Sequence, residues 1–343
     1  MNNNKCILVT GGAGYIGSHT FVELVNAGYN PIIVDDFRNS SEIIIEGLSA
    51  IVGFTPTVIT VDINDYNALE KVFEQYNFHG IIHFAADKAV GESVIDPLKY
   101  YGNNVCGMVT ILKLALKYQV KNFIFSSSCT VYGEPKSKKE VSEDMAVDRG
   151  SSPYGQTKII GEQILADLYS VNQELKIIAL RYFNPVGAHP SGKIGELPLG
   201  VPNNLFPYIM QTATGQREQL IVFGDDYQTT DGTCIRDYIH VVDLADAHVK
   251  ALRFAEKSSN GCLEFINVGT GKGVSVLEII KVFEQTIGIP LNYTIGPRRS
   301  GDVAEIFANC DRAKNLLNWS AHYTIQEAIS HAWQWEQNVL NYD

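Results

Sequence analysis

The chain of 343 residues is 45% hydrophobic and 19% charged, which allows two domains or one domain with a large elaboration. Its formal net charge of −11 disfavours nucleic acid as the main partner, because a phosphate backbone requires clustered lysine and arginine. The six cysteines are scattered without CxxC spacing, which favours reduced thiols in a cytoplasmic protein over disulfides or a metal cluster. The apolar stretch after Met1–Lys5 is too short for a signal peptide, and no window of about 18 apolar residues predicts a membrane span.

The N-terminal segment predicts a strand, a glycine turn, a helix and a second strand. In chain order these are a buried strand at 6–10, the glycines Gly11, Gly14 and Gly17, a helix closed by Gly28, and a strand at 32–34 that ends in Asp35 and Asp36. Such glycines let backbone amides approach a pyrophosphate, and the acid pairs with a ribose 2′-hydroxyl. The segment therefore predicts a site for NAD rather than NADP, because the acid would repel a 2′-phosphate.

Further strands alternate with helical segments and end in small or polar residues. They are expected at 58–61 before Asp62 and Ile63, at 80–84 before Ala85 and Ala86, at 122–125 before Ser126–Ser128, and at 176–180 before Arg181–Asn184. The alternation predicts an α/β fold, a doubly wound parallel sheet of the Rossmann type. Ligands bind beyond the carboxyl ends of such strands. We therefore expect these residues to line one crevice, although each alone also fits an ordinary loop.

A helix is predicted to begin at Pro153, with Ser152 as its cap. Tyr154 and Lys158 lie four residues apart and share one face of this helix. A nearby cation favours the phenolate, so the two side chains can form a proton-transfer pair. Taken alone, the two side chains are more simply explained as an incidental pair on a surface helix.

The composition changes after Asn184, where residues 185–207 contain five prolines. This change predicts a boundary between a dinucleotide-binding domain, 1–184, and a smaller, loop-rich α/β domain, 185–343. A segment near 237–256 is expected to return to the first domain, so the second domain is discontinuous. His240 and His248 form no metal site with nearby residues and are expected to be core or surface histidines.

Several stretches resemble the extended short-chain dehydrogenase/reductase family, and most of them resemble its sugar-nucleotide 4-epimerases. The glycine turn Thr10–His19, Tyr154 with Lys158, and the upstream serine mark the family. The more specific stretches are Lys88–Ser93, Phe125–Ser128, Arg181–Pro190, Pro202–Leu205, Arg236–Val241 and Pro297–Asp302. The resemblance implies NAD-dependent interconversion of UDP-glucose and UDP-galactose, with the UDP-sugar bound by the C-terminal domain. It also implies a homodimer.

The resemblance further implies a role for each catalytic side chain. Tyr154 removes the proton of the sugar 4-hydroxyl as C4 loses its hydride, and later returns a proton to the rotated 4-keto sugar. Lys158 and the cationic nicotinamide lower the pKa of Tyr154, and Ser128 hydrogen-bonds the reacting oxygen.

Binding residues carry over by position from the same family. The cofactor residues are Gly11, Gly14, Tyr15, Ile16, Gly17, Asp35, Asp36, Phe37, Arg38, Asn39, Ser40, Asp62, Ile63, Phe84, Ala85, Ala86, Lys88, Asn103, Ser128, Tyr154, Lys158 and Phe183. The substrate residues are Lys88, Ser128, Tyr154, Asn184, Asn204, Leu205, Phe223, Arg236, Tyr238, Arg299, Asp302 and Ile306. The pair Arg298 and Arg299 also fits a solvated surface.

Related activities remain as alternatives. Dehydratases of the family carry an Asp-Glu pair where this chain has Cys129 and Thr130, so elimination lacks its proton donors. A 4-epimerase of another UDP-sugar and a non-catalytic NAD-binding regulatory protein stay open. Ile306 stands where epimerases restricted to unacetylated sugars carry a tyrosine, so UDP-GlcNAc and UDP-GalNAc are possible substrates.

Overall fold

The computed structural model describes residues 5–134, 139–147, 150, 152–202, 204–299 and 301–340. Met1–Asn4, Asn203 and Ser300, which belong to stretches discussed above, lie outside these ranges. Within the described ranges, no helix is both long and apolar enough to cross a membrane.

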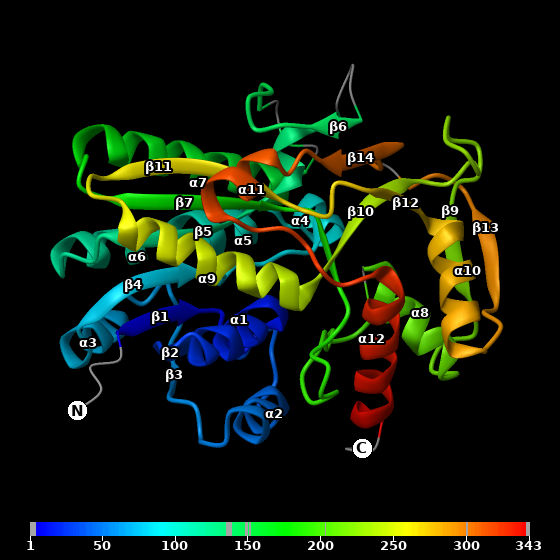
Figure 1. The fold of residues 1–343 in the computed structure, drawn as a ribbon, viewed down its shortest axis with the longest axis horizontal. Coiled ribbons are helices and arrows are strands. Elements are labelled where there is room, and N and C mark those ends of the chain that lie inside the picture. Colours follow the sequence, from blue (N-terminus) through cyan, green and yellow to red (C-terminus); the bar gives the residue numbers. More distant parts are fainter. Residues whose placement is uncertain are drawn as a thin grey trace.

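A seven-stranded parallel sheet forms the larger part of the molecule (Figure 1). Its strands, in spatial order, are β11 (Cys262–Val268), β7 (Lys176–Tyr182), β5 (Asn122–Ser128), β4 (Phe78–His83), β1 (Cys6–Thr10), β2 (Asn30–Asp35) and β3 (Val58–Thr60). The chain runs outward from β1 to β3 and then returns to place β4 on the other side of β1. The predicted doubly wound sheet is confirmed, and its ligand crevice is expected at this reversal between β1 and β4.

Helices cover both faces of this sheet, as the continuous apolar runs of its strands require. One face buries Val9, Ile82 and Ile178 against α1 (Tyr15–Asn26), α9 (Val241–Lys257) and α11 (Asp311–Leu317). The other buries Leu8, Ile81 and Phe123 against α3 (Tyr66–Gln75), α6 (Gly107–Lys117) and α7 (Pro153–Val171). The remaining helices of this half are α2 (Ile43–Val52), α4 (Val90–Ile95), α5 (Pro97–Tyr100), a π-helix (Tyr101–Cys106) and a 3-10 helix (Cys129–Tyr132).

Among the residues that the structure describes, two smaller sheets and three helices form the second part of the molecule (Figure 1). One sheet contains β6 (Glu140–Val141), β14 (Glu305–Ala308), β10 (Ile235–His240) and β12 (Gly273–Ser275), with β8 (Asn184–Val186) paired to β10. The other contains β9 (Leu220–Phe223) and β13 (Tyr293–Gly296). Helices α8 (Leu205–Ala213), α10 (Val276–Ile287) and α12 (Ile325–Val339) share an apolar core with these strands.

Two strands differ from the sequence expectation in a way that matters for the site. The strand predicted at 122–125 continues to Ser128, and that at 176–180 continues to Tyr182. The reason is mutual pairing, since Ser126–Ser128 register with Leu180–Tyr182. The three serines are therefore sheet residues and not a loop.

The segment that returns to the large sheet is longer than the predicted segment near 237–256. Helix α9 packs on the sheet beside α1, and β11 then adds the edge strand next to β7. The run Cys262–Val268 carried no strand assignment in the sequence analysis. The division near residue 184 stays a prediction.

Candidate active site

The glycine turn follows β1 and leads directly into α1. Gly11 has φ +69°, and a Cβ there would lie 2.7 Å from the backbone nitrogen of Ala85. A Cβ at Gly17 would lie 2.2 Å from the Gly11 carbonyl oxygen, so neither position tolerates a side chain. Gly14 occupies the N-cap of α1 and has no side chain to cover the first amides. The helix therefore presents uncapped N–H groups to an anion such as a pyrophosphate.

Asp35 ends β2 next to this turn. Its carboxylate accepts hydrogen bonds from the Ala13 amide at 3.0 Å, the Phe37 amide at 3.0 Å and the Ser40 hydroxyl at 2.8 Å. Burial raises the pKa of Asp35, and these hydrogen bonds oppose the rise. The carboxylate ties the glycine turn to the next loop and lies where a ribose hydroxyl is expected. These residues fit a dinucleotide.

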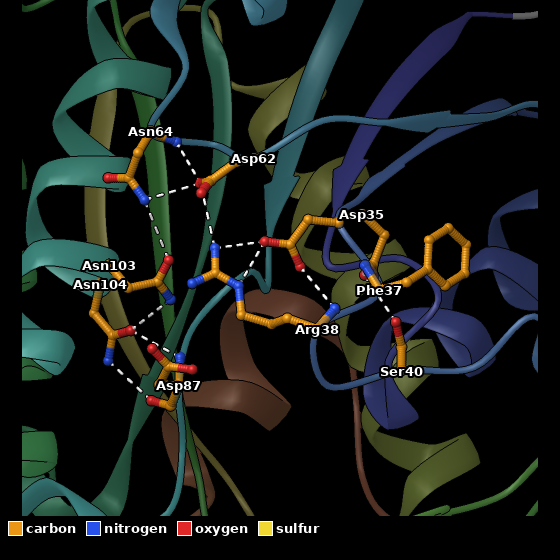
Figure 2. Close-up of polar contacts among 10 residues, drawn as sticks. Asp35, Phe37, Arg38, Ser40, Asp62, Asn64, Asp87, Asn103 and Asn104 are labelled. Atoms are coloured by element: carbon orange, nitrogen blue, oxygen red, sulfur yellow. Dashed lines mark hydrogen bonds and ion pairs between the residues drawn. The ribbon is translucent and has the colours of Figure 1, made fainter. Parts of the chain in front are cut away.

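The other predicted cofactor residues stand at the ends of neighbouring elements. Figure 2 shows Arg38 beside Asp62, and Asn64 between Asp62 and Asn103. Ile63 follows Asp62 and is buried, Asn39 lies in the loop with Arg38, and Tyr15 and Ile16 begin α1. Phe84–Ala86 and Lys88 follow β4, and Phe183 follows β7 as a buried residue. These positions all lie beyond carboxyl ends of strands or on helices adjoining them.

The three predicted catalytic residues come from β5 and α7. Ser128 is the last residue of β5, and Tyr154 and Lys158 lie on the first turns of α7, which Ser152 caps through the Gly155 amide at 3.1 Å. The helix start predicted at Pro153 is confirmed. The Lys158 ammonium lies 5.8 Å from the centroid of the Tyr154 ring and donates to the Ser126 carbonyl at 2.6 Å.

Burial dominates the ionisation of this pair. Burial raises the pKa of Tyr154 to about 12, while the Ser128 hydroxyl acts in the opposite direction. Burial likewise lowers the pKa of Lys158 to about 7, against the charge of Glu162. In the protein alone, the pKa of Tyr154 thus moves opposite to the direction expected for a base. A base at this position needs additional positive charge, which fits a cationic ring bound in the crevice.

A buried ion pair behind Lys158 was missed by the sequence analysis. Glu162, one turn along α7, accepts from Arg181 of β7 at 2.9 and 2.8 Å and from the Ser127 hydroxyl at 2.6 Å. Arg181 also donates to the Tyr132 hydroxyl at 3.0 Å. The signal available in the sequence was a glutamate spaced i+4 from Lys158, but its partner strand is set by the fold.

Apart from Lys88, Ser128 and Tyr154, the predicted substrate residues lie at or after residue 184, mostly on the second part of the molecule. Arg299 donates to Asp302 at 2.8 and 3.2 Å and lies 5.6 Å from the centroid of the Phe223 ring. Arg236 Nη2 lies 3.7 Å from an oxygen of the same carboxylate. Arg298 instead pairs with Asp226 and stacks on Tyr227, so the two neighbouring arginines diverge.

The remaining substrate residues lie on strands that adjoin Arg236. Asn184 of β8 registers with Tyr238 of β10, and Ile306 of β14 registers with Arg236. Ile306 is 6% exposed and shares an apolar cluster with Phe183 and Cys129. The Ile306 side chain therefore packs in the same cluster as Cys129, the residue that follows Ser128 at the end of β5.

Glu196 joins the two parts of the molecule and was also missed. Its Oε1 accepts from Lys88 Nζ at 3.0 Å and from Asn204 Nδ2 at 2.7 Å. Both donors were predicted to bind ligand, whereas Glu196 stands in a proline- and glycine-rich loop where spacing carries no signal. Asn204 precedes α8, and Leu205 begins that helix.

In the described part of the chain, the histidines and cysteines form no cluster arranged to bind a metal ion. His240 caps α9 through the Val242 amide at 3.1 Å and contacts His331, and His248 is buried against Tyr182. Among the described residues, no group of three or more His, Cys, Asp or Glu side chains is arranged to hold a metal ion.

A doubly wound sheet with a glycine turn, an acid after the second strand, and a serine, tyrosine and lysine beside them defines a nucleotide-cofactor enzyme of the dehydrogenase type. Comparison with known families gives the finer class, since residues 7–269 match the NAD dependent epimerase/dehydratase family. The chain belongs to this family.

Individual relatives match over nearly the whole chain. A UDP-glucose 4-epimerase of Bacillus subtilis is 49% identical over 335 residues, which cover 98% of each chain. A UDP-glucose 4-epimerase structure from Bifidobacterium longum, in complex with NAD+ and UDP, is 44% identical with a TM-score of 0.94, covering 98% of this chain and 99% of that one. Another from Stenotrophomonas maltophila, with bound NAD and formylated UDP-arabinopyranose, is 43% identical with a TM-score of 0.96, covering 99% and 100%.

Proposed function

We propose that this protein is an NAD-dependent UDP-glucose 4-epimerase that interconverts UDP-glucose and UDP-galactose. The observation that carries the proposal is the placement of Ser128, Tyr154 and Lys158 at the carboxyl end of β5, in the same sheet whose β1 leads into a glycine turn that fits a pyrophosphate. Relatives named UDP-glucose 4-epimerase, at 48–49% identity over 97–98% of this chain, support the choice of substrate.

The residues divide the chemistry between them. The glycine turn and Asp35 would hold NAD, which would supply the hydride acceptor for C4 and later the hydride donor. Tyr154 takes the proton of the 4-hydroxyl as a general base and returns it as an acid after the 4-keto sugar has turned in the pocket. Ser128 hydrogen-bonds the reacting oxygen, and Lys158 holds the nicotinamide ribose and adds positive charge near Tyr154.

The UDP group is assigned to the second part of the molecule. Arg236 and Arg299 converge on Asp302, and planar guanidinium groups donate paired hydrogen bonds to diphosphate oxygens. Asn184, Asn204, Leu205, Phe223 and Tyr238 are the proposed additional contacts. Residues 185–343, apart from the segment that returns to the large sheet, thus form the proposed substrate domain, and residues 1–184 form the cofactor domain.

Elimination chemistry is disfavoured at this site. Cys129 stands where a dehydratase has a carboxylic acid, and burial raises the pKa of its thiol to about 12. A thiol held neutral in this way is a poor base at neutral pH. Epimerisation needs no additional acid at the neighbouring carbon, so a neutral thiol at this position is compatible with it.

The second candidate substrate pair is UDP-GlcNAc and UDP-GalNAc. Ile306 lies in the cluster that contains Cys129 and Phe183, and isoleucine takes less space than a tyrosine at this position. We propose that the pocket accepts the N-acetyl group. Comparison of turnover of the two sugar pairs at equal concentration tests this, and turnover of the unacetylated pair alone contradicts it.

We also propose a cytoplasmic homodimer. Helices α4 and α5 expose Val94 (64%), Ile95 (86%) and Leu98 (79%), an apolar surface that a second copy would cover. Light scattering of the protein and of Ile95→Asp tests the assembly. A monomer of the unaltered protein at micromolar concentration contradicts it.

The decisive experiment supplies UDP-galactose to the purified protein without added cofactor and measures UDP-glucose. Formation of UDP-glucose, with transient reduction of a bound nicotinamide seen by absorbance, is the expected result. The absence of UDP-glucose even with excess NAD contradicts the proposal and favours a non-catalytic NAD-binding protein or an epimerase of another sugar.

A further inference from the structure

Arg38 connects the two loops that follow β2 and β3. It donates from Nε to Asp36 at 2.5 Å, and its Nη2 lies 2.5 Å from the same carboxylate and 3.3 Å from Asp62 Oδ1 (Figure 2). Asp36 lies in the loop after β2, which follows the acid expected at the ribose, and the family resemblance implies that the loop of Asp62 faces the adenine. The guanidinium therefore bridges the two halves of the proposed adenosine site.

Among the described residues, the contacts to the Asp62 carboxylate all end on one of its two oxygens, Oδ1. Oδ1 accepts from the Asn64 amide at 2.8 Å, from Asn64 Nδ2 at 3.0 Å and from Arg38. Among the described residues, Oδ2 has no hydrogen-bond donor, and the side chain is 47% exposed. Partial burial acts to raise the pKa of Asp62, but the hydrogen bonds from Asn64 and the charge of Arg38 outweigh it and lower the pKa. The group is a charged acceptor with one open oxygen.

The two hydrogen bonds from Asn64 do not by themselves prevent rotation of the Asp62 carboxylate. Both Asn64 contacts come from the same short loop, two residues from Asp62, and both end on Oδ1. Among the described residues, Arg38 supplies the contact to Asp62 from the loop after β2. Loss of Arg38 removes the restraint that fixes the direction of Oδ2.

Arg38 is also poorly placed to receive a third anion. Two carboxylates, from Asp36 and Asp62, already neutralise its charge. An unpaired arginine near this position would attract a 2′-phosphate, whereas Arg38 is engaged with the protein. These ion pairs make Arg38 a poor ligand for a 2′-phosphate.

We propose that Arg38 is a positioning residue for adenine recognition, which holds Asp62 so that Oδ2 accepts a hydrogen bond from the adenine 6-amino group. The inference rests on the proposed NAD site. It predicts discrimination by base, because hypoxanthine carries an oxygen in place of that amino group. Two acceptors would then face each other, and a buried or partly buried mismatch of this kind is costly.

The test is competitive exchange on the purified holoenzyme. The protein is equilibrated with equal concentrations of NAD and nicotinamide hypoxanthine dinucleotide, and the bound dinucleotides are separated and quantified. The unaltered protein should retain NAD over the analogue by about tenfold, which corresponds to about 1.4 kcal/mol. Arg38→Ala should reduce this ratio to about threefold or less. Arg253→Ala, which removes an exposed arginine on α9, is the matched control and should leave it unchanged.

Asp62→Ala separates positioning from a general structural effect. In that background Arg38→Ala should change the ratio no further, because the two residues act through one carboxylate. The inference is wrong if the ratio of bound NAD to bound analogue stays tenfold in Arg38→Ala. It is also wrong if Arg38→Ala weakens the binding of both dinucleotides equally. Failure of the unaltered protein to bind either dinucleotide would instead remove the proposed NAD function, and the inference with it.

Discussion

The ammonium nitrogen of Lys158 lies 5.8 Å from the centroid of the Tyr154 ring, one helical turn along α7. Both side chains are on the face of the helix that approaches β5, since Lys158 also donates to the Ser126 carbonyl. The contact gives the phenol a cationic neighbour, but burial still raises the pKa of Tyr154 to about 12. Ionisation of Tyr154 is therefore expected to depend on what binds in the crevice.

Tyr154→Phe tests the base directly. The substitution removes one oxygen and leaves the ring, so the variant should fold and retain NAD. Loss of general acid–base catalysis should lower kcat by about 10²–10⁴-fold. Steady-state conversion of UDP-galactose and the absorbance of retained cofactor measure the two effects separately. Undiminished turnover in a variant with normal NAD content would remove Tyr154 from the base role.

Lys158→Met tests the burial of the ammonium through pH. The folded-state pKa of Lys158 is lowered to about 7, whereas the unfolded value is about 10.4. Burial of the charged form costs stability fully below pH 7, and this cost disappears as the pH rises from 7 towards 10.4. The unfolded state binds the extra proton in this window, so stability should rise by up to about 1.4 kcal/mol per pH unit relative to the variant.

Urea unfolding of cofactor-free protein between pH 7.5 and 9 measures this difference. The free energy of unfolding of the unaltered protein should rise relative to that of Lys158→Met as the pH rises. Comparison between the two proteins cancels the tyrosines and thiols that titrate in both. Parallel stability curves across this range would mean that Lys158 is not the group responsible.

Glu196→Gln tests the contact between the two parts of the molecule. The substitution keeps the size of the side chain but removes the charge that pairs with Lys88. Lys88 is half exposed, and pairs of this kind contribute about 0.2–1 kcal/mol. We therefore expect the KM for the UDP-sugar to rise by about 1.4- to fivefold, with little change in kcat. A large fall in kcat at unchanged KM would assign Glu196 to the chemical step instead.

How far the sequence predicts this molecule depends on whether a residue acts within its own segment or through a distant partner. Ser152, Pro153 and the glycine turn follow local rules of capping and backbone freedom, and the structure places them as expected. Asp35 was likewise predictable, because it ends a strand at a fixed distance from the glycines. Such features need only a few consecutive residues.

Residues that depend on remote pairing were not predictable. Glu196 contacts Lys88, 108 positions away, and Arg181 meets Glu162 only because β7 lies beside β5 and below α7. The serines at 126–128 were expected to follow the end of the strand, yet pairing with β7 keeps them in the sheet. Register between strands decides these positions, and one segment does not contain that information.

Ile306→Tyr tests substrate range. Ile306 is buried beside Phe183 and Cys129, so a larger aromatic side chain must extend towards the substrate pocket. Turnover of UDP-GlcNAc should fall at least tenfold, while turnover of UDP-glucose should change by less than about threefold, since a group that fits poorly loses about 1–3 kcal/mol. Ile306→Val is the control, because it shortens the side chain. Equal effects of Ile306→Tyr on both sugars would show that the position has been misassigned.

Arg181→Leu tests the ion pair that supports the catalytic helix. The side chains of Arg181 and Glu162 are 3% and 7% exposed, so removal of one partner leaves a buried charge. Such a loss typically costs about 3–5 kcal/mol of folding free energy, which urea unfolding at pH 7 measures. The double variant Arg181→Leu/Glu162→Leu removes both charges and should be destabilised less than Arg181→Leu. If the double variant is the less stable protein, the side chains act by packing and not as an ion pair.

Glu162 also opposes the lowering of the Lys158 pKa, so its unpaired charge in Arg181→Leu should move that pKa upward. The stability difference from Lys158→Met would then develop at higher pH in the Arg181→Leu background.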